Sequence, residues 1–142
     1  MIYTDLTKKA LKLCFDAHKN QVDKTDIPYV FHPFHLAEQM DDEISTVCAL
    51  LHDVIEDTDY TFTDLEDMGY PKEVLSVLQL LTHDDAVPYM DYVEKISHNP
   101  IAKKVKIADL KHNSDLSRLD TVDERALERR EKYKKALELL SK

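Results

Sequence analysis

A cluster of polar residues on one predicted helix is the strongest chemical signal in the sequence. The run Leu50–Asp57, LLHDVIED, places His52 one helical turn before Glu56 and Asp53 one turn before Asp57. The apolar residues of the same run would anchor the other side of that helix. Neighbouring carboxylates are costly to bury unless something positive holds them, and a divalent metal would do so. The pattern therefore favours a metal-centred site over the alternative of a helix surface that is simply polar.

Two further segments add candidate ligands. His32 precedes a proline at the expected start of a helix, and Asp109 lies one turn before Asn113 on another helix. Taken singly, these residues are also explained by a capping or surface histidine and a solvated aspartate. Together with His52 and Asp53 they offer two imidazoles and two carboxylates. A mixed nitrogen and oxygen site with open positions suits Mn, Fe or Zn better than a closed structural zinc site does.

The elements that must position these residues are all predicted to be helices. Apolar residues recur at steps of three and four, and no alternating run is long enough for a strand. The loop Gln21–Phe31 interrupts this pattern, and a single glycine, Gly69, ends a short helix. The sequence predicts an all-α bundle of about seven to eight helices in one domain over residues 1–142. The expected helices lie around Leu6–Ala17, from Pro33, Ile44–Ile55, Thr63–Met68, Pro71–Leu81, Pro88–Ser97, from Pro100 past Asp109, and Asp123–Leu140, the last with Leu127, Ala136, Leu137 and Leu140 facing inward.

Composition narrows the class of protein. A net charge of −9 argues against nucleic acid or an anionic membrane as partner, and one glycine excludes a Gly-rich phosphate loop. No run approaches the length of a membrane span and no signal peptide is evident, so a cytoplasmic protein is expected. Cys14 and Cys48 are predicted to be buried free thiols. A small phosphorylated substrate remains compatible with the charge if a metal supplies local positive charge.

The motifs together resemble those of HD-domain metal phosphohydrolases, and more narrowly the hydrolase domain of Rel/Spo-type alarmone enzymes and the small alarmone hydrolases. The resemblance runs from Ala17 to Tyr133. Its most specific parts are the extension of the His-Asp pair to Glu56-Asp57-Thr58 and the run Ala108-Asp109-x-x-His112-Asn113. It implies an all-α HD-type fold, a bound Mn²⁺, and removal of pyrophosphate from the 3′ position of ppGpp or pppGpp, a small phosphorylated nucleotide.

The resemblance also implies a role for individual residues. It assigns metal binding to His32, His52, Asp53 and Asp109, and it assigns the orientation and deprotonation of the attacking water to Glu56 and Asp57. Nucleotide contacts are implied for Lys24, Thr25, Asn113, Arg129 and Tyr133. His18 is expected to be packed or to lie behind the ligands, and His112 to make a structural hydrogen bond.

The chain departs from the family pattern in the half of the site that recognises the base. The loop before Pro28-Tyr29 usually reads Arg-Lys-Ser-Gly-Glu in the family, whereas here Asp23 stands in the arginine's place. If Asp23 faces the base, the change Asp23→Arg should lower KM for a guanosine 3′-diphosphate substrate. Lys24 and Arg129 also supply little positive charge for so many phosphates, so either Lys104, Lys106 or Lys111 helps or the true substrate carries less phosphate. Two alternatives stay open: hydrolysis of another phosphorylated nucleotide or dinucleotide, and a catalytically silent HD module that binds a ligand or partner.

Overall fold

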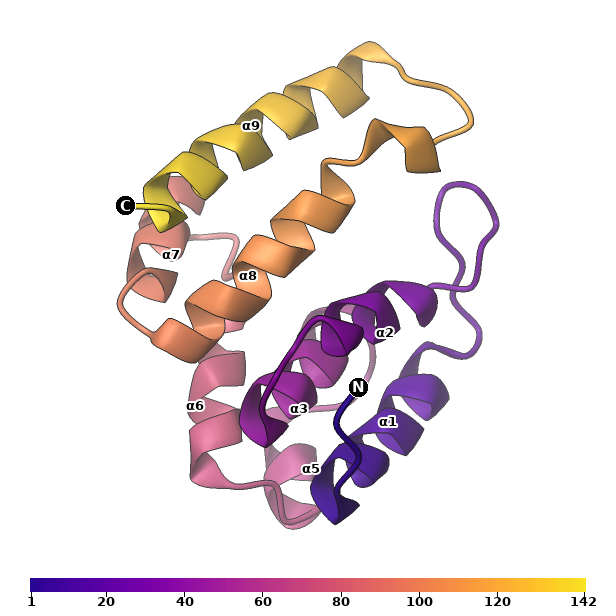
Figure 1. Cartoon of the computed structure of the whole chain (residues 1–142), viewed down its shortest axis with the longest axis vertical. Helices are drawn as coiled ribbons and strands as arrows, with labels where there is room; N and C mark the ends of the chain where they lie inside the picture. The colour runs from indigo at the N-terminus through magenta and orange to yellow at the C-terminus, as the bar shows by residue number, and fades with distance from the viewer.

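The structure is a computed structural model that describes all of residues 1–142, and it is entirely helical. The only β feature is an isolated bridge between Val22 and Pro28. The all-α, single-domain architecture predicted from the periodicity is confirmed (Figure 1). The elements are α1 (Asp5–His18), α2 (Phe31–Glu38), α3 (Glu43–Leu51), α4 (Val54–Asp57), α5 (Phe62–Asp67), α6 (Lys72–Leu81), α7 (Tyr89–Ile96), α8 (Pro100–Asn113), a 3₁₀ turn η1 (Leu116–Arg118) and α9 (Glu124–Leu140).

Short polar residues begin most of these helices. At five N-termini a side-chain oxygen accepts a hydrogen bond from a backbone N–H of the first turn, which satisfies a donor that the helix itself leaves unpaired. Gly69, at φ 88°, ends α5 in a conformation that residues with a side chain rarely adopt. The helix ends are therefore largely encoded locally. The five caps are Thr4, Asp42, Thr61, Asn99 and Asp123.

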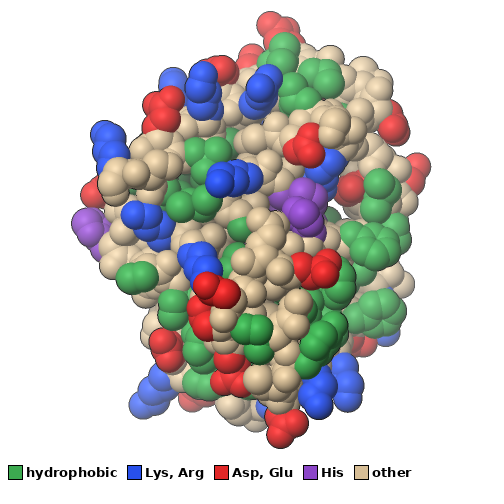
Figure 2. All heavy atoms as spheres, in the orientation of Figure 1, with side chains coloured by type: hydrophobic (Ala, Val, Ile, Leu, Met, Phe, Trp, Pro, Cys, Tyr) green, Lys and Arg blue, Asp and Glu red, His purple; other side chains and the backbone are tan.

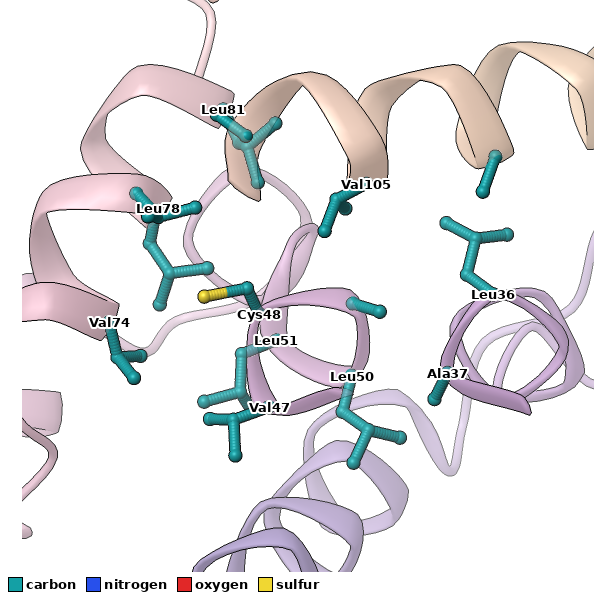
Figure 3. Packing of buried hydrophobic residues seen from close by; sticks show 14 of the residues in the cluster. Leu36, Ala37, Val47, Cys48, Leu50, Leu51, Val74, Leu78, Leu81 and Val105 are labelled. Carbon is teal, nitrogen blue, oxygen red and sulfur yellow. The ribbon is translucent and has the colours of Figure 1, made fainter. Parts of the chain in front are cut away.

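Helix α3 is the centre of the core and carries the site at its C-terminal end. It packs against α1, α2, α6 and α8. Figure 3 shows Val47, Cys48, Leu50 and Leu51 of this helix surrounded by side chains of its neighbours. Such dense apolar packing on every side holds the helix rigidly, so the residues that follow Leu51 start from a well-defined position. Cys14 and Cys48 are both buried and free, as predicted.

The predicted helix around Ile44–Ile55 is in fact two helices. The chain makes a turn at His52 and Asp53, where Asp53 has φ −106° and ψ 1°, and the single-turn helix α4 follows. Aspartate is a poor residue inside a helix because its carboxylate bonds elsewhere, and here Tyr29 donates its hydroxyl to the Asp53 carboxylate. The break adds a helix to the predicted number and aims His52 and Asp53 inward.

Helix α9 covers the other side of the site by packing on α7 and α8. Ala136 and Leu140 are fully buried, as predicted, but the prediction for Leu127 is wrong because that side chain is 48% exposed and its neighbour Ala126 is buried instead. None of the helices combines the length and the hydropathy that crossing a membrane requires.

Candidate active site

His52 presents one imidazole nitrogen to a buried cluster of ligand atoms. Its Nδ1 lies 2.7 Å from the carbonyl oxygen of Ala49, so Nδ1 carries the proton and Nε2 keeps its lone pair. Nε2 is buried and makes no hydrogen bond of good geometry. A buried polar atom without a partner is costly, and a metal ion would satisfy it.

The other candidate ligands converge on the same point from α2 and α8. Nε2 of His32 lies 2.9 Å from Oδ1 of Asp109, and Nε2 of His52 lies 3.5 Å from that oxygen. The ligand atoms of these three residues all lie within 4.8 Å of one another. Oδ2 of Asp53 adds a fourth atom, 2.9 Å from His52 Nε2 and 3.9 Å from His32 Nε2. Two imidazoles and two carboxylates in this arrangement fit a divalent metal.

A second set of contacts holds these ligands from behind. Nδ1 of His32 lies 2.7 Å from Nδ1 of His112, and their rings stack at 5°. Burial and the nearby Arg118 lower the pKa of His112 to about 4, so this histidine is neutral and can accept the proton of His32. His18 is fully buried, and its Nδ1 lies 2.9 Å from Oε1 of Gln21. Both histidines therefore have the packed, hydrogen-bonded positions that the sequence predicted.

Charge is distributed unevenly around Asp109. Burial would raise the pKa of this carboxyl group, but the Lys106 ammonium 3.0 Å from Oδ2 and the His32 imidazole hold that pKa well below its usual range. Asn113 donates to Oδ1 of the same carboxylate over 3.0 Å. Asp109 is consequently ionised and held in place as a candidate metal ligand. Because Lys106 is engaged in this way, it is not a free cation for a substrate.

Glu56 and Asp57 lie beside the ligand cluster but are not part of it. The backbone N–H of His83 donates to Oε1 of Glu56, and the side chain of Gln21 donates to the backbone carbonyl of Asp57 over 2.7 Å. Burial raises the pKa of both carboxyl groups, and the Asp53 carboxylate raises them further. A carboxylate with a raised pKa is a better proton acceptor, which is what a general base requires.

A cleft of about 280 Å³ opens from His32 toward the N-terminal end of α9. All five residues for which the resemblance implied nucleotide contacts line it: Lys24, Thr25, Asn113, Arg129 and Tyr133. Arg118 of η1 also lines it, and the sequence analysis missed this residue. The signal available was weak, namely a basic residue five positions after Asn113. Figure 2 shows histidine atoms at the surface of the molecule, with acidic and basic side chains close by.

Comparison with known proteins places the chain in a family. No family model matches the sequence. The chain is 33% identical over 129 residues to the guanosine-3′,5′-bis(diphosphate) 3′-pyrophosphohydrolase MESH1 of Danio rerio. This match covers 81% of this chain and 71% of that protein. The MESH1 of Mus musculus is 33% identical over 120 residues, 73% of this chain and 66% of that protein. The chain belongs to the HD-domain family of guanosine-3′,5′-bis(diphosphate) 3′-pyrophosphohydrolases.

Other members of this HD-domain family extend the comparison. The bifunctional (p)ppGpp synthase/hydrolase SpoT of Escherichia coli is 33% identical over 96 residues, which are 65% of this chain but only 14% of SpoT. The solved structure of a metazoan ortholog of SpoT superposes with a TM-score of 0.76 at 24% identity, covering 99% of this chain and 88% of that one. This structure shows that the HD-type fold is shared over the whole chain.

Within this family's pattern, Asp23 has a local role that the sequence did not indicate. Its Oδ1 accepts hydrogen bonds from the backbone N–H and the hydroxyl of Thr25, both over 2.8 Å, and from the N–H of Ile27 over 3.2 Å. These contacts hold the pKa of Asp23 low, although burial opposes them. Asp23 thus organises the loop in the manner of an Asx turn and does not offer Oδ1 to a base. Replacing Asp23 with arginine would therefore also remove contacts that hold the loop, which the Asp23→Arg prediction did not take into account.

Proposed function

We propose that this chain hydrolyses ppGpp and pppGpp at the 3′ position, releasing pyrophosphate and leaving GDP or GTP, with Mn²⁺ as the resident metal. The observation that carries the proposal is the convergence of His32, His52 and Asp109 on one buried point beside Glu56 and Asp57. Membership of the family supports the same activity, since the relatives named above carry it in their names.

The metal would be held by His32, His52, Asp53 and Asp109. When bound, it polarises a phosphoryl oxygen and lowers the pKa of water. Its charge would also offset the Asp53 and Asp109 carboxylates of the ligand set, of which Asp109 is paired with Lys106. Mixed nitrogen and oxygen ligands are compatible with Mn²⁺, Fe and Zn, and among these we propose Mn²⁺ because the resemblance to the alarmone hydrolases implies it.

The proton chemistry falls to Glu56 and Asp57. The attacking water adds to the 3′ phosphorus, the bond from that phosphorus to the ribose 3′ oxygen breaks, and the 3′ oxygen takes up a proton. A carboxylate with a raised pKa takes the proton of the water, and the hydrogen bond from the His83 N–H fixes the position of Glu56 for this task. Lys24, Thr25, Asn113, Arg129 and Tyr133 bind the rest of the nucleotide in the cleft.

The test is hydrolysis of ppGpp with added Mn²⁺, followed by separation of GDP and pyrophosphate. Glu56→Gln and Asp57→Asn should each lower turnover by roughly 10²–10⁴ while metal content stays the same. Asp59→Asn is the matched control, because Asp59 is exposed on the same segment and contacts none of the ligands. Metal loss in Glu56→Gln as large as in His52→Ala would show that Glu56 is a ligand instead.

A panel of phosphorylated nucleotides separates the two alternatives. Turnover of other nucleotides without turnover of ppGpp or pppGpp would indicate a different substrate. Turnover of none, with metal bound and the fold intact, would indicate a silent binding module. The presence of both Glu56 and Asp57 beside the ligands speaks against a silent module, since ligand binding alone does not need a paired base.

A further inference from the structure

The cations predicted from the sequence to assist phosphate binding are engaged elsewhere or lie outside the cleft. Lys104 pairs with Asp41 and with Asp42, and Lys106 pairs with Asp109. Lys111 is exposed and does not line the cleft. Lys24 and Arg129 alone would have to offset every phosphate outside the metal centre. The cleft needs a further positive group if a nucleotide with two diphosphates is to bind there.

Arg118 occupies the cleft wall with most of its donors unused. Its Nη1 donates to the carbonyl oxygen of His112 over 2.8 Å, which fixes the guanidinium next to the residue that supports His32. Its Nη2 lies 3.9 Å from Oδ2 of Asp23, which is attractive but too long for a hydrogen bond. A guanidinium has five N–H donors, so several remain for a ligand.

Asp23 attracts the Arg118 guanidinium but does not occupy its N–H donors. Oδ1 of Asp23 is occupied by Thr25 and Ile27 within its own loop, and only Oδ2 faces the guanidinium. The two residues also line a neighbouring cavity of about 300 Å³, so their pair forms the wall between that cavity and the cleft. In Figure 1 the loop before α2 and the η1 turn extend from the same side of the molecule, which is where this wall lies.

We propose that Arg118 is a nucleotide-binding residue that contacts the 5′-diphosphate from η1. The inference rests on the proposed function, because it takes the substrate to be a guanosine nucleotide. The 3′ group belongs at the ligand cluster, which Arg118 does not contact. A fixed guanidinium is suited to the remaining phosphate because its parallel N–H bonds match two phosphate oxygens.

The test measures equilibrium binding of GDP and of guanosine by titration calorimetry, with Mn²⁺ present throughout. GDP carries the 5′-diphosphate and guanosine does not, so their difference isolates the phosphate contact. Arg118→Met should weaken GDP binding about tenfold and change guanosine binding by less than about twofold. Arg118→Lys keeps the charge but loses the parallel N–H donors of the guanidinium. Its affinity for GDP should fall between those of the wild type and Arg118→Met. Arg130→Met is the matched control, because Arg130 is exposed on α9 and does not line the cleft.

Each outcome has a definite meaning. GDP affinity in Arg118→Met within about twofold of the wild type would overturn the inference, as would equal losses for GDP and guanosine. Absence of GDP binding by the wild type would also overturn it. A wild type that binds GDP through Arg118 yet leaves ppGpp intact would refute the proposed hydrolysis and leave the Arg118 contact standing. Thermal melting of each variant checks the fold, and Arg118→Lys decides the matter if Arg118→Met unfolds.

Discussion

Removing the ammonium group of Lys106 should destabilise the protein in a way that depends on metal. Lys106 Nζ lies 3.0 Å from Oδ2 of Asp109, and the two side chains are only 13% and 9% exposed. Lys106→Met keeps most of the side-chain volume beside the Tyr92 ring but leaves a buried carboxylate without its main cation. Breaking a buried pair from one side typically costs about 3–5 kcal/mol, so we expect a loss of about 3 kcal/mol in the metal-free protein.

Two comparisons follow from the same geometry. With a divalent metal bound, the loss should be smaller, because the ion supplies positive charge to the same carboxylate. The double variant Lys106→Met/Asp109→Asn should recover much of the loss without metal, since it no longer buries an unpaired charge. Lys104→Met is the control on the same helix. Its pairs with Asp41 and Asp42 are solvent-exposed, so its loss should stay below about 1 kcal/mol.

Urea unfolding followed by circular dichroism, with chelator and then with Mn²⁺, measures all these free energies. The reasoning would be refuted if Lys106→Met lost no more stability than Lys104→Met in chelator. It would also be refuted if the double variant were as unstable as Lys106→Met, because the cost would then come from lost packing rather than from an unpaired charge.

Three further predictions concern the metal, the pH dependence and the loop. Asp109→Ala protein that has been treated with chelator and then reloaded should hold less metal than the wild type. Full metal content by elemental analysis would contradict the assignment of Asp109 as a ligand. Burial raises the pKa of Glu56 above 4.5 and that of Asp57 above 3.8, so both carboxyl groups stay protonated to a higher pH than usual. Because a general base must be deprotonated, kcat/KM should rise with pH through an acid limb above those values. A pH profile without this limb would exclude Glu56 and Asp57 as the bases. Asp23→Arg should raise KM for ppGpp rather than lower it, because it removes the acceptor for Thr25 and Ile27 and repels Arg118; steady-state kinetics that show a lower KM would restore the original expectation.

Much of the fold could be predicted because its information is local. The apolar period of three and four residues, the polar caps and the one glycine are read within a turn or two of helix, and they predicted the all-α class and most helix positions. The break at His52 and Asp53 was not predictable in this way. Asp53 at this break accepts a hydrogen bond from Tyr29, which is 24 residues away, and a local pattern does not reveal a contact of that range. Leu127 was misassigned because the apolar period does not show which apolar residues of a helix the rest of the chain covers.

The candidate site likewise combines local information with long-range contacts. The sequence by itself determined which side chains are available, because His52, Asp53, Glu56 and Asp57 are neighbours in the chain and carry their spacing with them. Only the tertiary structure decided what each of the distant residues touches. It brought Asp109 to His32 across 77 positions, and it brought Arg118 to the loop at Asp23. Contacts of this kind depend on how helices pack against α3, and the packing of a core is a property of the whole chain rather than of any one segment.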